Sequence, residues 1–251
     1  QEADDKARPP QEAEDKEDCP ICCDALPKLS SQFLRYTCCG KGLHKKCAKD
    51  LHGNTSMTLE QINTCIMCRA KQVDIGSKQE IEQLRGWVKR GKAWAMHELA
   101  TRYKDGVGVK QSDKKAIELY EMAAKRGNAT AQHNLGIFYE QGIYGLTQSS
   151  IRALGYFTLA ANQGDANSQY NLGLYYKQGI RGITQSSERA CELYTLAAEQ
   201  GHADAQYNLG NMYVNGDGIE QSNSKARVWW TKAAAQGYEN AIKNLKILDE
   251  N

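Results

Sequence analysis

A segment of 36 or 37 residues recurs along the second part of this 251-residue chain, and this repeat constrains the fold more than any other feature. Four copies, called repeats 1 to 4, begin at Ala93, Ala129, Ala166 and Ala203, and a shortened copy begins at Glu239. A period in this range is typical of α-solenoids, in which each unit contributes two helices and stacks only on its neighbours. We therefore predict a mostly α fold whose residues 93–251 form four helix-turn-helix repeats and a trailing helix.

The residues that recur within each repeat are spaced as in helices. In the first helix a Leu is followed four residues later by a Tyr on the same face, and three residues later by a Gly that favours a left-handed helix end. The second helix is expected to begin near Asp113, Ser150, Ser187 and Asn223, which are good N-cap residue types. It carries an aromatic residue and an Ala pair, and we expect the repeated Leu, Tyr, Ala and Gly positions to form the core. The repeated positions are Leu99, Leu135, Leu172 and Leu209; Tyr103, Tyr139, Tyr176 and Tyr213; Tyr120, Phe157, Tyr194 and Trp230; and the Ala pairs that begin at Ala123, Ala160, Ala197 and Ala233. Residues 77–92 are predicted to be a lone second helix that caps the stack.

The first part of the chain has a different composition. Eight of the nine cysteines lie in the first 68 residues, and seven of them stand with one His in the order Cys-x-x-Cys, Cys-Cys, His-x-x-Cys and Cys-x-x-Cys. Zinc takes four such ligands tetrahedrally, and a site closed by four protein ligands is structural. We predict two structural Zn²⁺ ions and no catalytic residue. The predicted ligands are Cys19, Cys22, Cys38, Cys39, His44, Cys47, Cys65 and Cys68.

Some ligand assignments have rivals. Cys23 is an alternative only for the first site, His52 could replace His44, and a single one of Cys38 and Cys39 could ligate. Residues 19–76 contain few long aliphatic side chains, so metal-ligand bonds must supply much of the folding energy of this segment. Residues 1–18 are predicted to be a disordered acidic segment, because eight acidic residues stand against three basic ones with no large apolar residue.

The net charge and the cysteine content indicate which kinds of partner and which cellular compartment to expect. The net charge of +2 gives no field that points to a nucleic acid or a membrane, and we expect neither as a partner. Cysteines in metal spacing indicate a reducing compartment, the cytoplasm or the nucleus. We find no apolar run of membrane-spanning length and no signal peptide. Cys191 is predicted to be a small buried hydrophobe, and His97, His133 and His202 are interpreted as structural helix residues at dissimilar repeat positions.

The repeat pattern A-x-A-x-x-x-L-G-x-x-Y-x-x-G, followed by K/R-A and A-A-x-x-G, resembles the Sel-1-like repeat, a relative of the tetratricopeptide repeat. The resemblance covers roughly residues 81–250, and repeat 1 departs from it at Ala100, where the others have Gly. It implies a superhelical scaffold that holds other proteins on a concave surface and is not an enzyme. Partner-binding residues would then lie at the variable positions between the repeated ones.

The cysteine-rich segment resembles a RING-type zinc finger over about 50 residues. The cross-braced order of that family implies one zinc on Cys19, Cys22, His44 and Cys47 and another on Cys38, Cys39, Cys65 and Cys68. The resemblance also implies two partner-binding residues: Ile21 as the apolar contact to a ubiquitin-conjugating enzyme, and Arg69 as a contact to ubiquitin and that enzyme together. Three features depart from the family: Lys41 stands where most members have a His ligand, the last Cys pair lacks a Pro, and no Trp precedes Cys65.

Two functions of different classes follow from these resemblances. The first is a protein-interaction adaptor that acts as a RING-type ubiquitin ligase, with the finger recruiting a charged ubiquitin-conjugating enzyme and the repeats holding an unknown protein substrate. Such a ligase would contribute no nucleophile of its own. The second is a non-catalytic zinc-binding scaffold. A PHD-type chromatin reader fits the ligand order less well, since Asn63 stands where that family has an aromatic residue.

Overall fold

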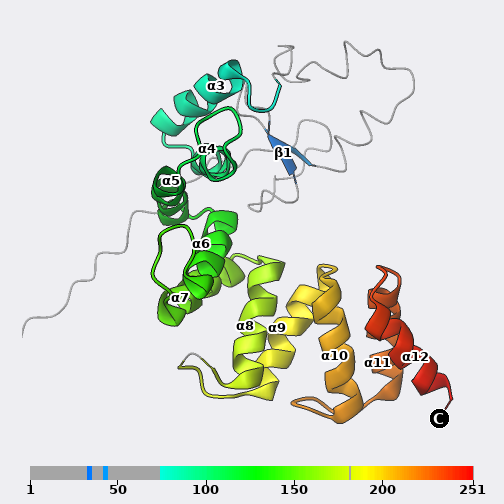
Figure 1. Ribbon diagram of the computed structural model, residues 1–251. Helices are drawn as coiled ribbons and strands as arrows, with labels where there is room; N and C mark the ends of the chain where they lie inside the picture. Colours follow the sequence, from blue (N-terminus) through cyan, green and yellow to red (C-terminus); the bar gives the residue numbers. More distant parts are fainter. Residues whose placement is uncertain (1–32, 36–41, 45–73, 181, 251) are drawn as a thin grey trace, which may run out of the picture. The chain divides into compact units, whose positions relative to one another are not determined.

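The computed structural model describes residues 33–35, 42–44, 74–180 and 182–250 (Figure 1). The chain divides into two units, Gln1–Gln72 and Val73–Asn251. In the first unit, strands β1 (Phe33–Arg35) and β2 (Gly42–His44) pair antiparallel, with Phe33 opposite His44. This strand pair was not among the elements predicted from the sequence.

Every regular element in the described part of the second unit is a helix, which confirms the predicted α-solenoid (Figure 1). The first helices of the repeats are α4 (Ala93–Asp105), α6 (Ala129–Gln141), α8 (Ala166–Gln178) and α10 (Ala203–Asn215). The second helices are α5 (Asp113–Lys125), α7 (Ser150–Asn162), α9 (Ser187–Glu199) and α11 (Asn223–Ala234). Before them lies α3 (Lys78–Lys89), and after them α12 (Glu239–Asp249). Each helix packs against the one before it and the one after it.

The second helices begin where the sequence predicts, but the capping residue is one position earlier. Ser112, Ser149, Ser186 and Ser222 have extended backbones, and each hydroxyl accepts a hydrogen bond from the amide three residues later. The serine is the N-cap because its side chain satisfies an amide that has no partner within the helix. The first helices end as predicted, at glycines in the left-handed conformation, such as Gly142 with φ 67°.

In repeats 2 to 4 the aromatic residue of the second helix packs directly on the backbone of the first helix at a glycine. A Cβ added at Gly173 would lie 2.7 Å from Cε1 of Tyr194, and one at Gly210 would lie 2.4 Å from the ring of Trp230. Glycine at this position therefore brings the two helices of a repeat close together. The predicted leucines are all buried, and Leu135 and Leu209 are fully inaccessible.

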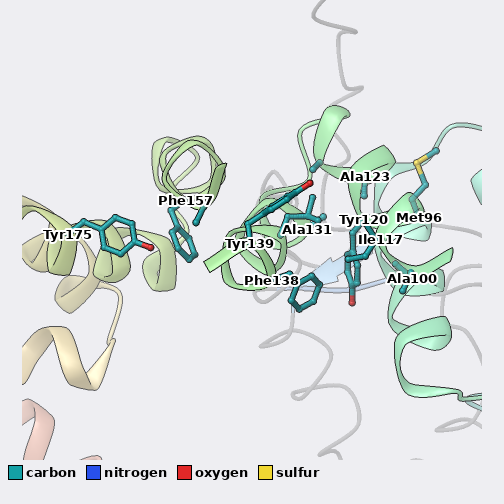
Figure 2. Close-up of a cluster of buried hydrophobic side chains, with 14 residues drawn as sticks. Met96, Ala100, Ile117, Tyr120, Ala123, Ala131, Phe138, Tyr139, Phe157 and Tyr175 are labelled. Carbon is teal, nitrogen blue, oxygen red and sulfur yellow. The ribbon is translucent and has the colours of Figure 1, made fainter. Parts of the chain in front are cut away.

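The core is continuous from repeat 1 into repeat 3. A single cluster of buried side chains runs from Met96 in repeat 1 to Tyr175 in repeat 3 (Figure 2). Its aromatic rings meet edge to face across repeat boundaries: Tyr120 and Phe138 are 5.5 Å apart between ring centres, and Phe157 and Tyr175 are 5.9 Å apart. Such pairs add to the free energy gained from burial, so they stabilise the stacking of repeats.

The prediction that all repeated Tyr and Gly positions are core was wrong in part. Tyr139 is buried, but Tyr103, Tyr176 and Tyr213 are only half-buried, and several helix-ending glycines are exposed. A cation from the following helix covers the rings, with Lys115 5.2 Å from the Tyr103 ring centre and Lys225 5.5 Å from that of Tyr213. These three tyrosines therefore lie at the edge of the core.

In the described part of the chain, no helix combines the length and apolar character that a membrane crossing requires.

Candidate functional site

The structure does not test the predicted zinc sites. Seven of the eight predicted ligands and both predicted partner-binding residues, Ile21 and Arg69, lie outside the described residues. His44 ends strand β2, but only its backbone is described. Among the described residues, no group of three or more His, Cys, Asp or Glu side chains is arranged to hold a metal ion. The two-zinc finger therefore stays a prediction.

Neighbouring repeats are joined by buried glutamines. Nε2 of Gln206 donates a hydrogen bond of 3.0 Å to the carbonyl oxygen of Ala198. Ala198 lies at the end of the second helix of the preceding repeat. Oε1 of Gln206 accepts a bond of 2.9 Å from Gln236, at the end of the second helix of its own repeat. Gln132 and Gln169 make the same two kinds of bond, and repeat 1 has Met96 at this position. At each junction the glutamine adds a second hydrogen bond to a carbonyl that already accepts from a backbone amide at the helix end, and this repeated position was not predicted from the sequence.

Two histidines occupy the same repeat position, contrary to the prediction that all three lie at dissimilar ones. His97 and His133 are the fifth residues of α4 and α6. Each reaches a neighbouring first helix: Nε2 of His97 lies 3.4 Å from Nδ2 of Asn134, and Nδ1 of His133 lies 3.0 Å from Oγ of Ser168. The histidines are therefore part of the contacts between repeats.

The set of His133, Ser168 and Asp165 is not built for nucleophilic catalysis. Both the Ser168 hydroxyl and Oδ1 of Asp165, at 3.5 Å, meet the same ring nitrogen of His133. A catalytic triad instead needs the serine at one ring nitrogen and the acid at the other. Ser168 is also fully buried, so no substrate carbonyl could reach its hydroxyl.

Burial favours the neutral form of the His133 and His202 side chains. Burial lowers the pKa of His133, and nearby His202 lowers it further, although Asp165 acts in the opposite direction. Burial also lowers the pKa of His202. Nδ1 of His202 accepts a bond of 3.3 Å from the amide of Ala205, and so caps α10. A proton on that nitrogen would remove the cap and place a positive charge at a helix N-terminus.

A cleft of about 300 Å³ lies between α8, α9 and α10. Asn208, Asn211 and Asn215 of α10 line one wall, at spacings of three and four residues that put them on one helix face. Leu174 and Lys177 of α8 line the other wall. The floor is apolar, from Tyr194 and Met212, which are both buried.

The polar groups at this cleft are held by specific contacts. Lys177 forms an ion pair with Asp217, which follows α10. Oδ1 of Asn211 accepts a bond of 3.3 Å from Nδ2 of Asn244 in α12. Asn208 is hydrogen-bonded to Tyr194, and burial raises the pKa of the Tyr194 hydroxyl well above its usual range. The cleft thus offers neutral amides above an apolar floor, with its two charges paired.

The repeat pattern predicts partner binding at variable positions, and these asparagines were not among the residues predicted to bind. The signal was available in part: Asn134, Asn171, Asn208 and Asn244 recur at one position of successive repeats. Asn211 and Asn215, in contrast, are specific to repeat 4. Only the packing of α8 beside α10 shows that they share a cleft with Leu174.

A second surface consists of exposed aliphatic residues on the second helices. Met122, Leu159 and Leu196 lie at equivalent positions of α5, α7 and α9, and Lys232 takes this position in α11. We call these three aliphatic residues the outer row. The periodicity of the repeat places them in register along one side of the stack.

Comparison with known proteins identifies the repeats. The family described as Sel1 repeat matches residues 95–128, 129–165, 166–202 and 203–238. The crystal structure of a Sel1 repeat protein from Oxalobacter formigenes is similar, with 32% identity, a TM-score of 0.66, and coverage of 72% of this chain and 51% of that one. A protective antigen of uropathogenic Escherichia coli with an SLR fold shares 32% identity at a TM-score of 0.61, over 66% of this chain and 35% of that one. This chain therefore spans about half or less of the length of these relatives. A search of curated proteins found no match.

Proposed function

We propose that this chain, which belongs to the Sel1 repeat family of protein-interaction scaffolds, is an adaptor with two functional parts. The repeats hold a protein partner. The cysteine-rich segment is a RING-type finger with two structural zinc ions that recruits a charged ubiquitin-conjugating enzyme.

The cleft between α8, α9 and α10 is the observation that carries the first half of the proposal. It combines an apolar floor with a few fixed polar groups, which is how protein binding sites provide affinity and orientation. Three of its lining residues, Leu174, Asn211 and Asn215, lie at variable positions of the first helices, beside the repeated residues Tyr194 and Asn208. Changes there alter the partner without altering the fold.

The cysteine spacing supports the second half of the proposal. Cys19, Cys22, His44 and Cys47 would hold one Zn²⁺, and Cys38, Cys39, Cys65 and Cys68 the other. A thiolate and imidazole set of this kind suits zinc, and eight ligands close both sites. The bound ions fold the segment and perform no chemistry on a substrate.

Transfer of ubiquitin would then depend on proximity and alignment. Ile21 makes the apolar contact to the conjugating enzyme, and Arg69 steadies the complex of that enzyme with its thioester-linked ubiquitin. The substrate held on the repeats supplies the attacking amine. Holding two reactants in a reactive geometry is by itself a large source of rate acceleration.

The experiment that tests this proposal is discharge of ubiquitin from a panel of charged conjugating enzymes. The intact protein is compared with Cys65→Ser and Arg69→Ala, and zinc is measured in each sample. We expect faster discharge with the intact protein, loss of both zinc and discharge with Cys65→Ser, and loss of discharge with zinc retained for Arg69→Ala. Full activity of Arg69→Ala would contradict the role given to that residue.

A non-catalytic scaffold is the second candidate. The absence of a Pro within Cys65–Cys68 and of a Trp before Cys65 favours it, because both residues are typical of fingers that bind conjugating enzymes. This candidate predicts two bound zinc ions per chain and no discharge with any enzyme of the panel. That result would reduce the finger to a protein-binding module and leave the role of the repeats unchanged.

A further inference from the structure

We propose that the N-terminal end of the helical stack binds an acidic segment, rich in Asp and Glu, of a partner protein. The binding residues are five cations at the end of α3, just before α4 and at the end of α5, and we call them the basic edge: Lys89, Arg90, Lys92, Lys125 and Arg126 (Figure 1). The inference rests on the proposed role of the repeats as the partner-holding part, and it names the chemistry of one partner. The basic edge is separate from the cleft between α8, α9 and α10.

The charges of the basic edge are not compensated within the described part of the chain. All five side chains are exposed, and none forms an ion pair with a described acid. The acid nearest to them in the sequence, Glu121, instead accepts a bond of 3.3 Å from the Tyr139 hydroxyl. Like charges held together repel, so an acidic ligand would be attracted and would also relieve this repulsion.

Two arginines of different helix ends lie close together on the basic edge. Nε of Arg126 would lie 3.9 Å from a Cβ added at Gly91, so this side chain reaches the loop between Arg90 and Lys92. The guanidinium of Arg90 lies 4.6 Å from the ring centre of Trp87, and this stacking restricts its movement. A guanidinium binds a carboxylate through two parallel hydrogen bonds, so this end of the stack offers two such groups to acidic side chains.

The packing of repeat 1 does not explain why an arginine stands at position 126. In repeats 2 to 4 the equivalent residue is a glutamine that donates to the buried glutamine of its own first helix, as in the 2.7 Å bond from Gln163 to Gln132. Repeat 1 has Met96 in place of that acceptor, so Arg126 has no hydrogen-bond partner among the described residues. A carboxylate of a bound partner would supply the missing acceptor.

The start of α4 adds a further place where a carboxylate is favourable. Lys92 is the N-cap of α4, and a positive charge at this end opposes the helix dipole. No described side chain caps α4, whereas Asn128 and Asp165 cap α6 and α8. An acidic side chain beside Lys92 would therefore pair with its charge and interact favourably with the helix end.

The charges further along the same side of the stack favour a short acidic segment over a nucleic acid. Glu199 in α9 is the exposed equivalent of Lys125, and Asp204 follows in the first turn of α10. A long polyanion that followed this side would meet these acids and be repelled. Trp87, the aromatic residue beside the basic edge, is covered by Arg90, so no base can stack on that face of its ring.

The test is the binding of a fluorescein-labelled peptide of six Glu-Ser units to the intact protein, measured by fluorescence anisotropy. A peptide of six Gln-Ser units is the uncharged control, and a single-stranded oligonucleotide of equal charge is the competing polyanion. The double variant Arg90→Gln, Arg126→Gln introduces the residue that repeats 2 to 4 have at this position, and Lys125→Asn introduces that of repeat 2. The double variant Lys243→Gln, Lys246→Gln removes two exposed charges of α12 and is the matched control. Circular dichroism checks that each variant is folded.

We expect the Glu-Ser peptide to bind and the Gln-Ser peptide not to bind. Binding should weaken by about tenfold in Arg90→Gln, Arg126→Gln and by about threefold in Lys125→Asn, because each exposed ion pair contributes only a few-fold to affinity. The control Lys243→Gln, Lys246→Gln should bind like the intact protein. Added salt should weaken binding less in the double arginine variant than in the intact protein, because fewer charge pairs remain to be screened.

Three results would overturn the proposal: no binding of the Glu-Ser peptide, equal affinity of the two double variants, or tighter binding of the oligonucleotide that is lost in Arg90→Gln, Arg126→Gln. The second result would show that only the net charge matters, and the third would assign the basic edge to nucleic acid. All three concern binding to the repeats and not ubiquitin discharge, so a failure of this inference is distinguishable from a failure of the adaptor proposal.

Discussion

The same substitution, Gly→Ala, should have opposite effects at two helical glycines of adjacent repeats. Gly173 in α8 faces the ring of Tyr194, and an added Cβ would lie 2.7 Å from Cε1 and 2.8 Å from Cδ1. Gly155 in α7 is exposed, and a Cβ there would meet nothing within 4 Å. Gly155→Ala therefore measures the gain in helix propensity alone, whereas Gly173→Ala measures that gain together with the steric clash.

The relative sizes of the propensity gain and the packing cost decide whether each substitution stabilises or destabilises the protein. Replacing a helical Gly by Ala stabilises by about 1 kcal/mol when nothing obstructs the methyl group. Overpacking a filled site destabilises by about 1–3 kcal/mol. Tyr194 is 2% exposed and hydrogen-bonded to Asn208, so its ring has little room to move. We expect Gly155→Ala to raise the free energy of unfolding by about 1 kcal/mol and Gly173→Ala to lower it, by up to about 2 kcal/mol once the gain in helix propensity is subtracted from the overpacking cost.

Repeat 1 accommodates a Cβ at the equivalent position, and the hydroxyl of its aromatic residue has a different partner from that of Tyr194. Ala100 takes the place of this glycine there, and Tyr120 has its hydroxyl 2.9 Å from Oγ1 of Thr101. Repeat 3 has Leu174 in place of Thr101, so no hydroxyl is present to hold Tyr194 in a similar way.

Urea denaturation followed by circular dichroism measures both effects, as shifts of the midpoint at constant slope. Wild-type or higher stability of Gly173→Ala would refute the reasoning, because the ring would then have given way at no cost. A neutral or destabilising Gly155→Ala would instead show that this helix does not follow the propensity scale.

Three further predictions concern caps, junctions and pH. Asn128→Ala removes the 2.8 Å bond from the amide of Ala131 and should lower the free energy of unfolding by about 1 kcal/mol in urea denaturation, whereas an unchanged midpoint would exclude a capping role. Gln206→Met removes the bonds that Gln206 makes to the Ala198 carbonyl and to Gln236, and should destabilise by about 1 kcal/mol, with faster hydrogen exchange at that junction as the local readout. Burial lowers the pKa of His133 and His202 in the folded state, so the unfolded state binds more protons. The free energy of unfolding should therefore be highest above about pH 6.5 and fall as the pH drops through the folded-state pKa values. Denaturation midpoints between pH 7 and pH 5 check the last prediction, and a double His133→Gln, His202→Asn variant should flatten the profile.

The sequence by itself determined the repeat architecture. The recurring Leu, Tyr, Ala and Gly residues fixed which segments are helical, because helical periodicity and glycine ends are local properties of the chain. The cysteine spacing likewise carries the zinc prediction without help from the structure. The N-cap was misplaced by one residue because Asp113 and Ser112 are both good capping types, and only the backbone conformation distinguishes them.

Tertiary structure alone decided which polar residues meet. Gln206 and Gln236 are 30 residues apart, and His133 and Ser168 are 35 apart, so no local pattern could pair them. It also decided that Tyr103 lies at the edge of the core although Tyr139, at the same repeat position, is buried. The cleft likewise depends on tertiary structure, because Leu174 and Asn211 line the same cleft only when successive repeats stack side by side. Periodicity specifies the helices one at a time, whereas the binding surface depends on the distances between them.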